Sequence, residues 1–301
     1  MVEKRNAWNW LFDIANYVFL TLLAIVCLYP MLHVLFGSVS DPRLLTKHTG
    51  ILLHPLGFTS RGYEIVFNNP NIWAGYANTL FYVIVGTVLR TLMTMLGAYV
   101  MMQKDFMPRR VLMFLFVFTM YFSGGLIPDY LVVTRLHLLN TRWAIIIPSL
   151  ISTWNMIILK TAFSQIPPSL SESAKLDGAG DLTILFRIIL PAAKASVAVI
   201  IMYYAVGEWN SWFSAAIYLP GRRDLYPLQL FLREILISNS ASGNAAEAAG
   251  GSGSDADAIE ALIEDVVRYC TICVATIPIL CIYPFVQKYF VKGVMMGSIK
   301  E

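Results

Sequence analysis

Charged residues are scarce in this chain. Asp, Glu, Lys and Arg make up only 14% of its 301 residues, whereas 57% are apolar or aromatic and the mean hydropathy is +0.63. A soluble domain averages about 25% charged and about 45–50% apolar residues. The shortage of charge excludes an ordinary soluble enzyme, and it excludes a disordered chain, because disorder needs high charge and low hydrophobicity. The composition predicts an integral membrane protein.

Motifs of nucleotide and metal chemistry are also missing. The chain has no G-x-x-x-x-G-K-[ST] phosphate-binding loop and no H-E-x-x-H, and its four histidines lie far apart. Cys270 and Cys273 form a C-x-x-C pair, but a structural zinc needs four ligands and no second pair exists. We therefore expect no catalytic residue, no metal site and no cofactor bound by this chain, and we interpret the cysteines as small apolar side chains.

Six apolar runs are long enough to cross a membrane as helices, each taking roughly 20 residues. They lie at about 17–36, 78–101, 111–127, 143–163, 195–218 and 266–290. The third is interrupted near Ser123-Gly124-Gly125. The runs predict an all-α integral membrane protein with a single domain over 1–301.

Two polar segments separate the later runs. Residues 164–194 lie between the fourth and fifth runs, and 219–265 between the fifth and sixth. The middle of the second segment, 238–257, is rich in Gly, Ala and Ser, as flexible linkers are. Lys and Arg are commoner on one side: twelve lie in the segments that share a side with the N-terminus and eight in the opposite ones. This bias predicts cytoplasmic N- and C-termini, a cytoplasmic 164–194 and an extracytoplasmic 219–265.

The 164–194 segment has the signals of two short helices. Pro167-Pro168 stops the fourth helix, and Ser169 with Glu172 has the spacing of a capping box, which predicts a helix from Leu170. Gly178 should end that helix in a left-handed conformation, and Asp181 should cap a second helix over 182–190. The segment predicts a rigid cytoplasmic docking element. Glu172 has a simpler alternative role as a helix-capping residue alone.

The same segment resembles a known motif. It reads Glu172-Ser173-Ala174, three residues, Gly178, nine residues, Ile188, one residue and Leu190-Pro191. This is similar to the EAA loop of permease subunits of ATP-driven importers, with Ser173 in place of the usual alanine. Asp177-Gly178-Ala179, the Asn78-Thr79-Leu80 start of the second run and the sequence 288–293 resemble carbohydrate-uptake permeases of the maltose-transporter type, in the oligo- and polysaccharide branch.

The resemblance implies a type I importer permease fold in a bacterial cytoplasmic membrane. It implies a second, non-identical permease, two ATPase subunits that hold ATP and Mg, an extracytoplasmic solute-binding protein and a carbohydrate substrate moved by alternating access. It also implies that 164–194 holds the coupling helix. The residues expected to contact the ATPase are Glu172, Ser173, Ala174, Asp177, Gly178 and Ala179. An importer of another solute, such as glycerol phosphate, is the alternative; an intramembrane enzyme is disfavoured because no catalytic set is present.

Polar groups inside the predicted spans are candidates for the substrate path. Charges there are costly and usually face a partner or a water-filled cavity. Arg90 and Glu208 could pair with each other, line the path, or reach an interface. A sugar is bound by aromatic faces beside hydrogen-bonding groups. The candidate path residues are Glu208, Trp212, Asn210, Trp154, Asn155 and Arg90. Helical spacing predicts that Glu208 and Trp212 share a face and that Asn210 points elsewhere; interfacial anchoring is the alternative for the tryptophans.

Overall fold

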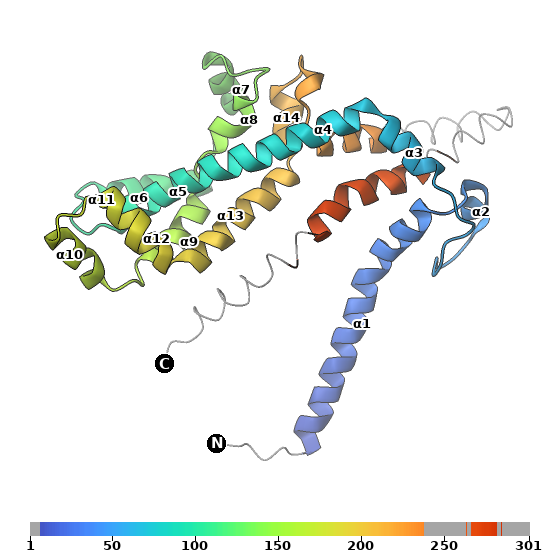
Figure 1. Ribbon diagram of the computed structural model, residues 1–301, viewed down its shortest axis with the longest axis horizontal. Coiled ribbons are helices and arrows are strands. Elements are labelled where there is room, and N and C mark those ends of the chain that lie inside the picture. Colours follow the sequence, from blue (N-terminus) through green and yellow to red (C-terminus); the bar gives the residue numbers. More distant parts are fainter. Residues whose placement is uncertain (1–6, 238–262, 264–265, 282–283, 285–301) are drawn as a thin grey trace. The chain divides into compact units, whose positions relative to one another are not determined.

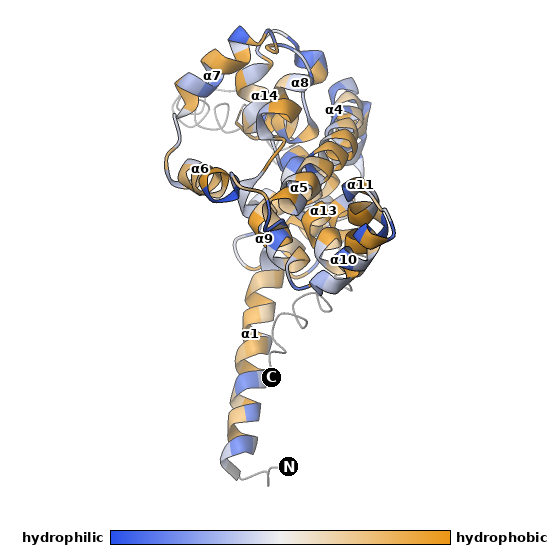
Figure 2. Cartoon of the chain, turned by 90° about the vertical axis from the view of Figure 1, so that its left-hand side faces the viewer, coloured by the Kyte–Doolittle hydropathy of each residue, from blue (hydrophilic) through white to orange (hydrophobic). Residues whose placement is uncertain are grey.

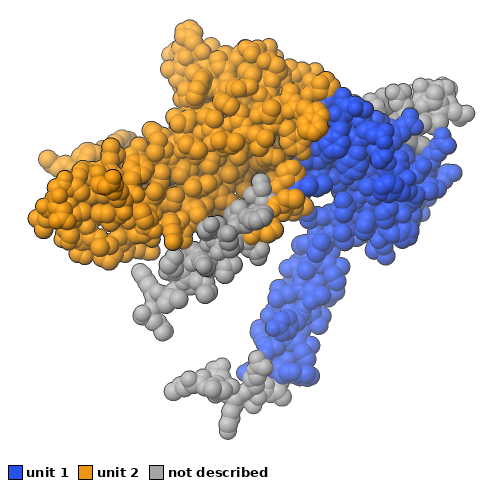
Figure 3. All heavy atoms as spheres, viewed as in Figure 1, with its two compact units in different colours: residues 1–69, 234–277 blue, residues 70–233, 278–301 orange. Residues whose placement is uncertain are grey.

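The computed structural model describes residues 7–237, 263, 266–281 and 284, and the elements in this part of the chain are helices joined by turns, with one isolated bridge between Ser40 and Phe58 (Figure 1). The chain divides into two compact units: residues 1–69 with 234–277, and residues 70–233 with 278–301 (Figure 3). The predicted linker 238–257 lies outside the described residues.

The first unit contains the first predicted span. Helix α1 (Ala7–Ser38) is predominantly apolar after its first turns, which carry Asn9, Asp13 and Asn16, and almost all of its side chains are exposed, as expected of a helix that faces lipid (Figure 2). It continues past both ends of the predicted 17–36 run. Two short helices follow, α2 (Pro42–Lys47), whose first turn is capped by Asp41, and α3 (Arg61–Asn68).

Close packing in the first unit depends on small side chains. A Cβ at Gly62 would lie 2.7 Å from the Sγ of Cys270, on the helix Val266–Cys281. Cys270 is buried and its thiol donates to the carbonyl of Ser38 at 3.1 Å. Ser38 also bonds the hydroxyl of Tyr63 at 2.8 Å, and burial raises the pKa of Tyr63 to about 12. Cys270 therefore packs as a small side chain, as predicted.

The second unit is built on one long helix. Segments α4 (Pro70–Phe81), η1 (Tyr82–Gly86) and α5 (Thr87–Met102) form a continuous helix from Pro70 to Met102, so it begins eight residues before the predicted 78–101 run. Its second half packs against α9 (Thr153–Phe163) and α13 (Lys194–Trp209) (Figure 1). Met95, Met156, Leu159 and Ile200 are buried in this three-helix contact.

The third and fourth predicted spans are bent. Helix α6 (Arg109–Tyr121) meets α7 (Leu126–Arg135) at 119°, and the break lies at Gly124-Gly125, where Gly125 has φ +86°. Helix α8 (Trp143–Ile146) with η2 (Ile147–Ser149) meets α9 at 51°. Among the residues that the structure describes, two helices are long and apolar enough to cross a membrane, or up to five if each bent pair counts as one.

The remaining elements follow the fourth span. They are α10 (Pro168–Leu176), α11 (Asp181–Ile184), η3 (Leu185–Ile189), α12 (Leu190–Ala192), α14 (Phe213–Tyr218), η4 (Arg223–Leu225) and the helical residues 228–237. The 181–192 helix turns by 91° into α13, next to Pro191. Helix α13 ends at Trp209, so the predicted 195–218 span is interrupted there. Residues 282–283 and 285–290 of the last predicted span lie outside the described residues.

Candidate functional sites

Helix α10 lies within the predicted coupling segment, but it does not begin with a capping box. Pro168 is its first residue, and Pro167 at the cap position makes no side-chain bond. Ser169 and Glu172 are therefore already inside the helix, and the predicted start at Leu170 is wrong. A proline is favoured at the first helical position because its fixed φ is already helical and its missing N–H is not needed there.

The end of α10 is as predicted. Gly178 has φ +81°, and its amide donates to the carbonyl of Lys175 at 3.0 Å. The amide of Ala179 donates to the carbonyl of Ala174 at 2.9 Å. These two bonds form a Schellman motif, which satisfies carbonyls that the helix end leaves open. The turn after α10 is thus rigidly defined by backbone bonds.

One side of α10 is available to a partner. Glu172, Ser173, Asp177 and Gly178 are exposed, Ala179 is half-buried, and only Ala174 is buried against the core. A cavity of about 290 Å³ lies beside the helix, between Glu172 and Lys175 on α10 and Gln103 and Asp105 in the turn after α5. The arrangement presents two carboxylates and a well-defined turn to the surface.

Asp181 does not cap the second helix. The cap residue is Gly180, and the carboxylate of Asp181 accepts a hydrogen bond from the hydroxyl of Tyr99 on α5 at 3.0 Å. The buried side chains of Ile184, Leu185 and Ile189 then fix this helix to the three-helix core. The coupling segment is therefore attached to α5 by a polar contact at one end and by apolar packing along its length.

Arg90 and Glu208 form a buried ion pair between α5 and α13, which is one of the three possibilities that the sequence left open. The other guanidinium nitrogen of Arg90 donates to the hydroxyl of Ser149 at 2.7 Å and to the carbonyl of Ile145 at 3.2 Å. Among the described residues, the second carboxylate oxygen of Glu208 has no hydrogen-bond partner. The pair joins three segments, α5, α8–η2 and α13.

Tyr204 makes a second polar link one turn before Glu208 on α13. Its hydroxyl bonds that of Thr94 on α5 at 2.7 Å and accepts from the amide of Ser152 at 3.2 Å. Ser152 is the cap residue of α9, since its hydroxyl accepts from the amide of Asn155 at 3.4 Å. The bend between η2 and α9 is thus tied to both α5 and α13.

The predicted common face of Glu208 and Trp212 is wrong, because the helix ends between them. Helix α13 stops at Trp209, Asn210 is its C-cap residue, and Trp212 has a non-helical φ of −134°. Trp209 is buried near Tyr76, with ring centroids 6.3 Å apart, whereas Asn210 is exposed. Trp212 is half-buried, with the guanidinium of Arg233 3.4 Å from its ring centroid.

The candidate pair at the start of α9 is divided between surface and interior. Trp154 is 62% exposed, whereas Asn155 is only 7% exposed. The exposed ring of Trp154 is available to stack on a sugar, whereas the buried side chain of Asn155 is not. Of the six predicted path residues, Trp154 and Asn210 are therefore exposed, Trp212 is half-buried, and Arg90, Asn155 and Glu208 are buried.

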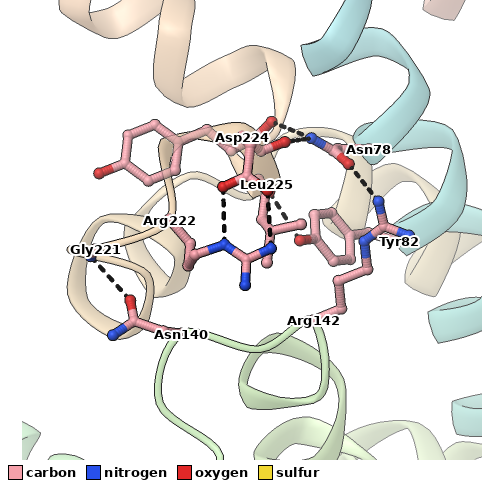
Figure 4. Close-up of polar contacts among 9 residues, drawn as sticks. Asn78, Tyr82, Asn140, Arg142, Gly221, Arg222, Asp224 and Leu225 are labelled. Carbon is pink, nitrogen blue, oxygen red and sulfur yellow. Dashed lines mark hydrogen bonds and ion pairs between the residues drawn. The ribbon is translucent and has the colours of Figure 1, made fainter.

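A polar cluster that the sequence did not predict joins three chain segments (Figure 4). The side-chain amide of Asn78 donates to the carbonyls of Asp224 (2.7 Å) and Tyr226 (3.1 Å), and its oxygen accepts from Arg142 at 3.0 Å. The hydroxyl of Tyr82 donates to the carbonyl of Leu225 at 2.8 Å. The signal was present in Asn78-Thr79, a polar pair at the start of an apolar run, but its partners lie about 146 residues later.

The surface of this cluster carries an ion pair. Arg222 donates two hydrogen bonds of 2.9 Å to the carboxylate of Asp224, which lowers the pKa of Asp224 and raises that of Arg222. Asn140, in the turn before α8, accepts from the amide of Gly221 at 2.9 Å. The turn 219–226 is thus held to α4–η1 and to the turn before α8 in one network.

Similarity to known proteins identifies the family. Residues 6–241 match the model of the binding-protein-dependent transport system inner membrane component. The chain belongs to this family. It is therefore a multi-pass membrane permease of an ATP-binding-cassette importer and a transport subunit, not a catalytic one, as predicted. The match covers the coupling segment, the buried ion pair and the Asn78 cluster.

Three relatives illustrate the range of this permease family. The polygalacturonan/rhamnogalacturonan transport system permease protein YtcP of Bacillus subtilis (strain 168) is 40% identical, covering 97% of this chain and 99% of its own. The arabinooligosaccharides transport system permease protein AraQ of the same strain is 24% identical over 96% of both chains. A chain in the crystal structure of a bacterial ABC transporter involved in the import of the acidic polysaccharide alginate is 30% identical, with TM-score 0.84, covering 96% of this chain and all of that one.

Proposed function

We propose that this permease imports an oligosaccharide or a polysaccharide fragment. The observation that carries the proposal is the likeness along nearly the whole chain to permeases whose names specify galacturonan, arabinooligosaccharides and alginate. The chain would work beside a second, non-identical permease, two ATPase subunits and a solute-binding protein outside the membrane.

In this proposal the chain crosses the membrane six times and has both ends in the cytoplasm. The Lys and Arg distribution and the apolar runs support this topology. Helix α10 and the turn at Gly178 then face the cytoplasm, and the Asn78 cluster lies on the opposite side.

Helix α10 would transmit the motion of the ATPase subunits. Its exposed Glu172 and Asp177 are available to cations of a partner, and the Schellman turn fixes where they point. The buried residues Ile184, Leu185 and Ile189 connect this segment to α5, α9 and α13. A displacement of α10 would therefore move the three-helix core and change access to the path.

Sugar contacts would come from the exposed residues of the predicted path. Trp154 and Asn210 are exposed and Trp212 is half-buried, so these three can face a substrate. Arg90, Asn155 and Glu208 are buried, and for Arg90 and Glu208 we propose a structural role in place of substrate contact.

The test is uptake by cells that carry the complete importer. Radiolabelled galacturonan and arabinan fragments and glycerol phosphate are supplied separately. We expect uptake of an oligosaccharide, and Trp154→Ala should reduce it at least tenfold at equal complex abundance. Trp143→Ala is the matched control, because Trp143 is also an exposed tryptophan, at the start of α8. Uptake of glycerol phosphate without saccharide uptake would refute the proposal, and equal losses in both variants would refute the role of Trp154.

A further inference from the structure

A pocket of about 380 Å³ lies where the turn after α5, the start of α6 and the end of α9 meet, within the second unit. Its lining is rich in cations and contains no carboxylate. The residues that line it are Met102, Lys104, Arg109, Arg110, Met113, Lys160 and Ser164. Four positive charges around one pocket repel each other, and the repulsion is stronger near a membrane than in bulk water because the local dielectric constant is lower.

None of these four cations forms an ion pair in the part of the chain that the structure describes. The two ion pairs found there are Arg90–Glu208 and Arg222–Asp224, and neither includes a pocket residue. The carboxylates of Asp105 and Glu172 line the neighbouring cavity, which shares Lys104 with the pocket. Arg109 makes one long contact of 3.5 Å to the carbonyl of Gln103. The four cations therefore match a ligand that brings negative charge.

The helix that continues from the pocket has one face packed on the core through Leu112, Met113 and Phe116 and an opposite apolar face that is exposed. None of the residues of α6 is buried, and Phe114 and Phe118 are 67% and 44% exposed. Arg110, Phe114 and Phe118 are spaced four residues apart, so they share one face of the helix. The two rings lie 6.2 Å apart. This face places a cation at the helix start and aromatic surface along the next two turns.

We propose that this pocket binds the phosphodiester headgroup of an anionic phospholipid, whose acyl chains lie along the apolar face of α6. A free phosphate would use the cations but leave the apolar face uncovered, and a neutral lipid would cover that face but leave the cations uncompensated. A basic pocket at the end of membrane helices is a recognised way of holding an acidic lipid headgroup. The inference does not depend on which saccharide the importer carries.

The test uses the purified complete complex, titrated in detergent with dioleoyl-phosphatidylglycerol and, separately, with dioleoyl-phosphatidylcholine, while native mass spectrometry counts bound lipid. We expect tighter binding of the phosphatidylglycerol. Lys104→Gln with Arg110→Gln should weaken it by about fivefold per cation removed, since each basic residue near an anionic surface contributes about 1 kcal/mol. Both side chains are exposed, so the fold should tolerate the change.

The matched control removes two exposed cations that do not line the pocket, by Arg187→Gln with Lys194→Gln. It should bind phosphatidylglycerol as the wild type does. Equal binding of the two lipids by the wild type, or equal losses in both double variants, would overturn the proposal. Inorganic phosphate that displaces the lipid at equal concentration would assign the pocket to free phosphate instead.

A second measurement covers the case in which the double variant does not assemble. A photoactivatable phosphatidylglycerol with its reactive group near the phosphate is cross-linked to the wild-type complex, and the modified peptides are mapped. Adducts on the start of α6 or the end of α9 are expected. Adducts distributed evenly over the exposed helices, with none at the pocket, would overturn the proposal.

Discussion

Two charged side chains inside the apolar core decide how its helices are joined. Arg90 and Glu208 are 6% and 5% exposed, and each would be very costly there without the other. Arg90 also bonds Ser149 and the carbonyl of Ile145, which distributes its positive charge over three acceptors. The pair contributes specificity of packing, because its geometry fits one arrangement of α5, α8 and α13.

Replacing only Arg90 or only Glu208 should therefore lower the stability of the complex more than replacing both. We expect Arg90→Met or Glu208→Met to destabilise the assembled complex by about 3–5 kcal/mol, because an uncompensated buried charge remains. The double variant should regain most of this loss. Thermal unfolding of the purified complex measures the three variants, and Arg222→Gln, which breaks an exposed pair, is the control with little expected effect. A double variant that is as unstable as the sum of the singles would show that the two charges do not interact.

The side-chain amide of Asn78 donates hydrogen bonds to the backbone carbonyls of Asp224 and Tyr226. Asn78→Asp removes that donor and places a carboxylate against the carbonyls of Asp224 and Tyr226, next to Arg142. We expect a loss of about 1–3 kcal/mol from unsatisfied buried groups and faster proteolysis in the 219–226 turn. Asn68→Asp, at an exposed position on α3, is the matched control. Unchanged proteolysis in Asn78→Asp would contradict a role for Asn78 in holding the turn.

The sequence alone could single out candidate functional residues, but it could not predict most of their contacts. The sequence singled out Arg90 and Glu208 as charges inside apolar runs, but it left their pairing as one of three possibilities. The orientation of Trp212 was not predictable, because a periodicity argument assumes that the helix continues, and α13 ends at Trp209. The Asn78 cluster was also unpredictable, since its acceptors are backbone carbonyls, which leave no trace in the sequence.

At the scale of the element, the α10 segment shows which end of a helix a sequence defines better. Gly178 was predicted correctly, because a left-handed residue at a helix end is almost always glycine. The start was predicted too late, since Ser169 and Glu172 match a capping box but Pro168 is already helical. Asp181 was also predicted to be a cap, because aspartate is common at that position. Its carboxylate instead accepts a hydrogen bond from the hydroxyl of Tyr99, which lies far away in the sequence.

The left-handed turn gives a sharp test of coupling. Gly178→Val should be strained, because a β-branched residue at φ +81° is disfavoured by about 1–2 kcal/mol, although no atom lies within 4 Å of the added Cβ. We expect severalfold lower binding-protein-stimulated ATP hydrolysis in the reconstituted importer. Asn at position 178 should retain most of it, because asparagine tolerates this conformation.

Gly180→Val is the matched control, since Gly180 also has open space around it but a φ of −73° that valine accepts. It should leave the stimulated rate unchanged. Equal losses at positions 178 and 180 would mean that side-chain bulk, not backbone conformation, disturbs the contact with the ATPase.

At the scale of the whole molecule, composition was sufficient for the class of protein and insufficient for the shape of its spans. Apolar runs predict where the chain is in contact with lipid, but not where it bends. The bends lie at Gly124-Gly125, at Ser152 and near Pro191. The first and the third were anticipated, because adjacent glycines and a proline are strong local signals, whereas the Ser152 bend depends on Tyr204.

The number of membrane crossings can be tested across the fifth span. Helix α13 has 16 residues and is about 24 Å long, shorter than a hydrocarbon core of about 30 Å. The non-helical turn at Asn210–Trp212 and helix α14 are therefore needed to complete the crossing. If the turn and α14 complete the crossing, the exposed residues Leu176 and Pro220 lie on opposite sides of the membrane. Leu176→Cys and Pro220→Cys are made in a background in which the exposed Cys27 and Cys281 are replaced by serine and the buried Cys270 and Cys273 are kept.

An impermeant maleimide added to intact cells should label Pro220→Cys, and it should label Leu176→Cys only after the membrane is permeabilised. The background without either new cysteine should stay unlabelled in both conditions. Labelling of both positions from outside would mean that α13 and α14 enter and leave on one side, as a re-entrant segment does. The opposite pattern, with Leu176→Cys labelled first, would place α10 outside, where no ATPase could reach it, and would exclude its proposed role in coupling.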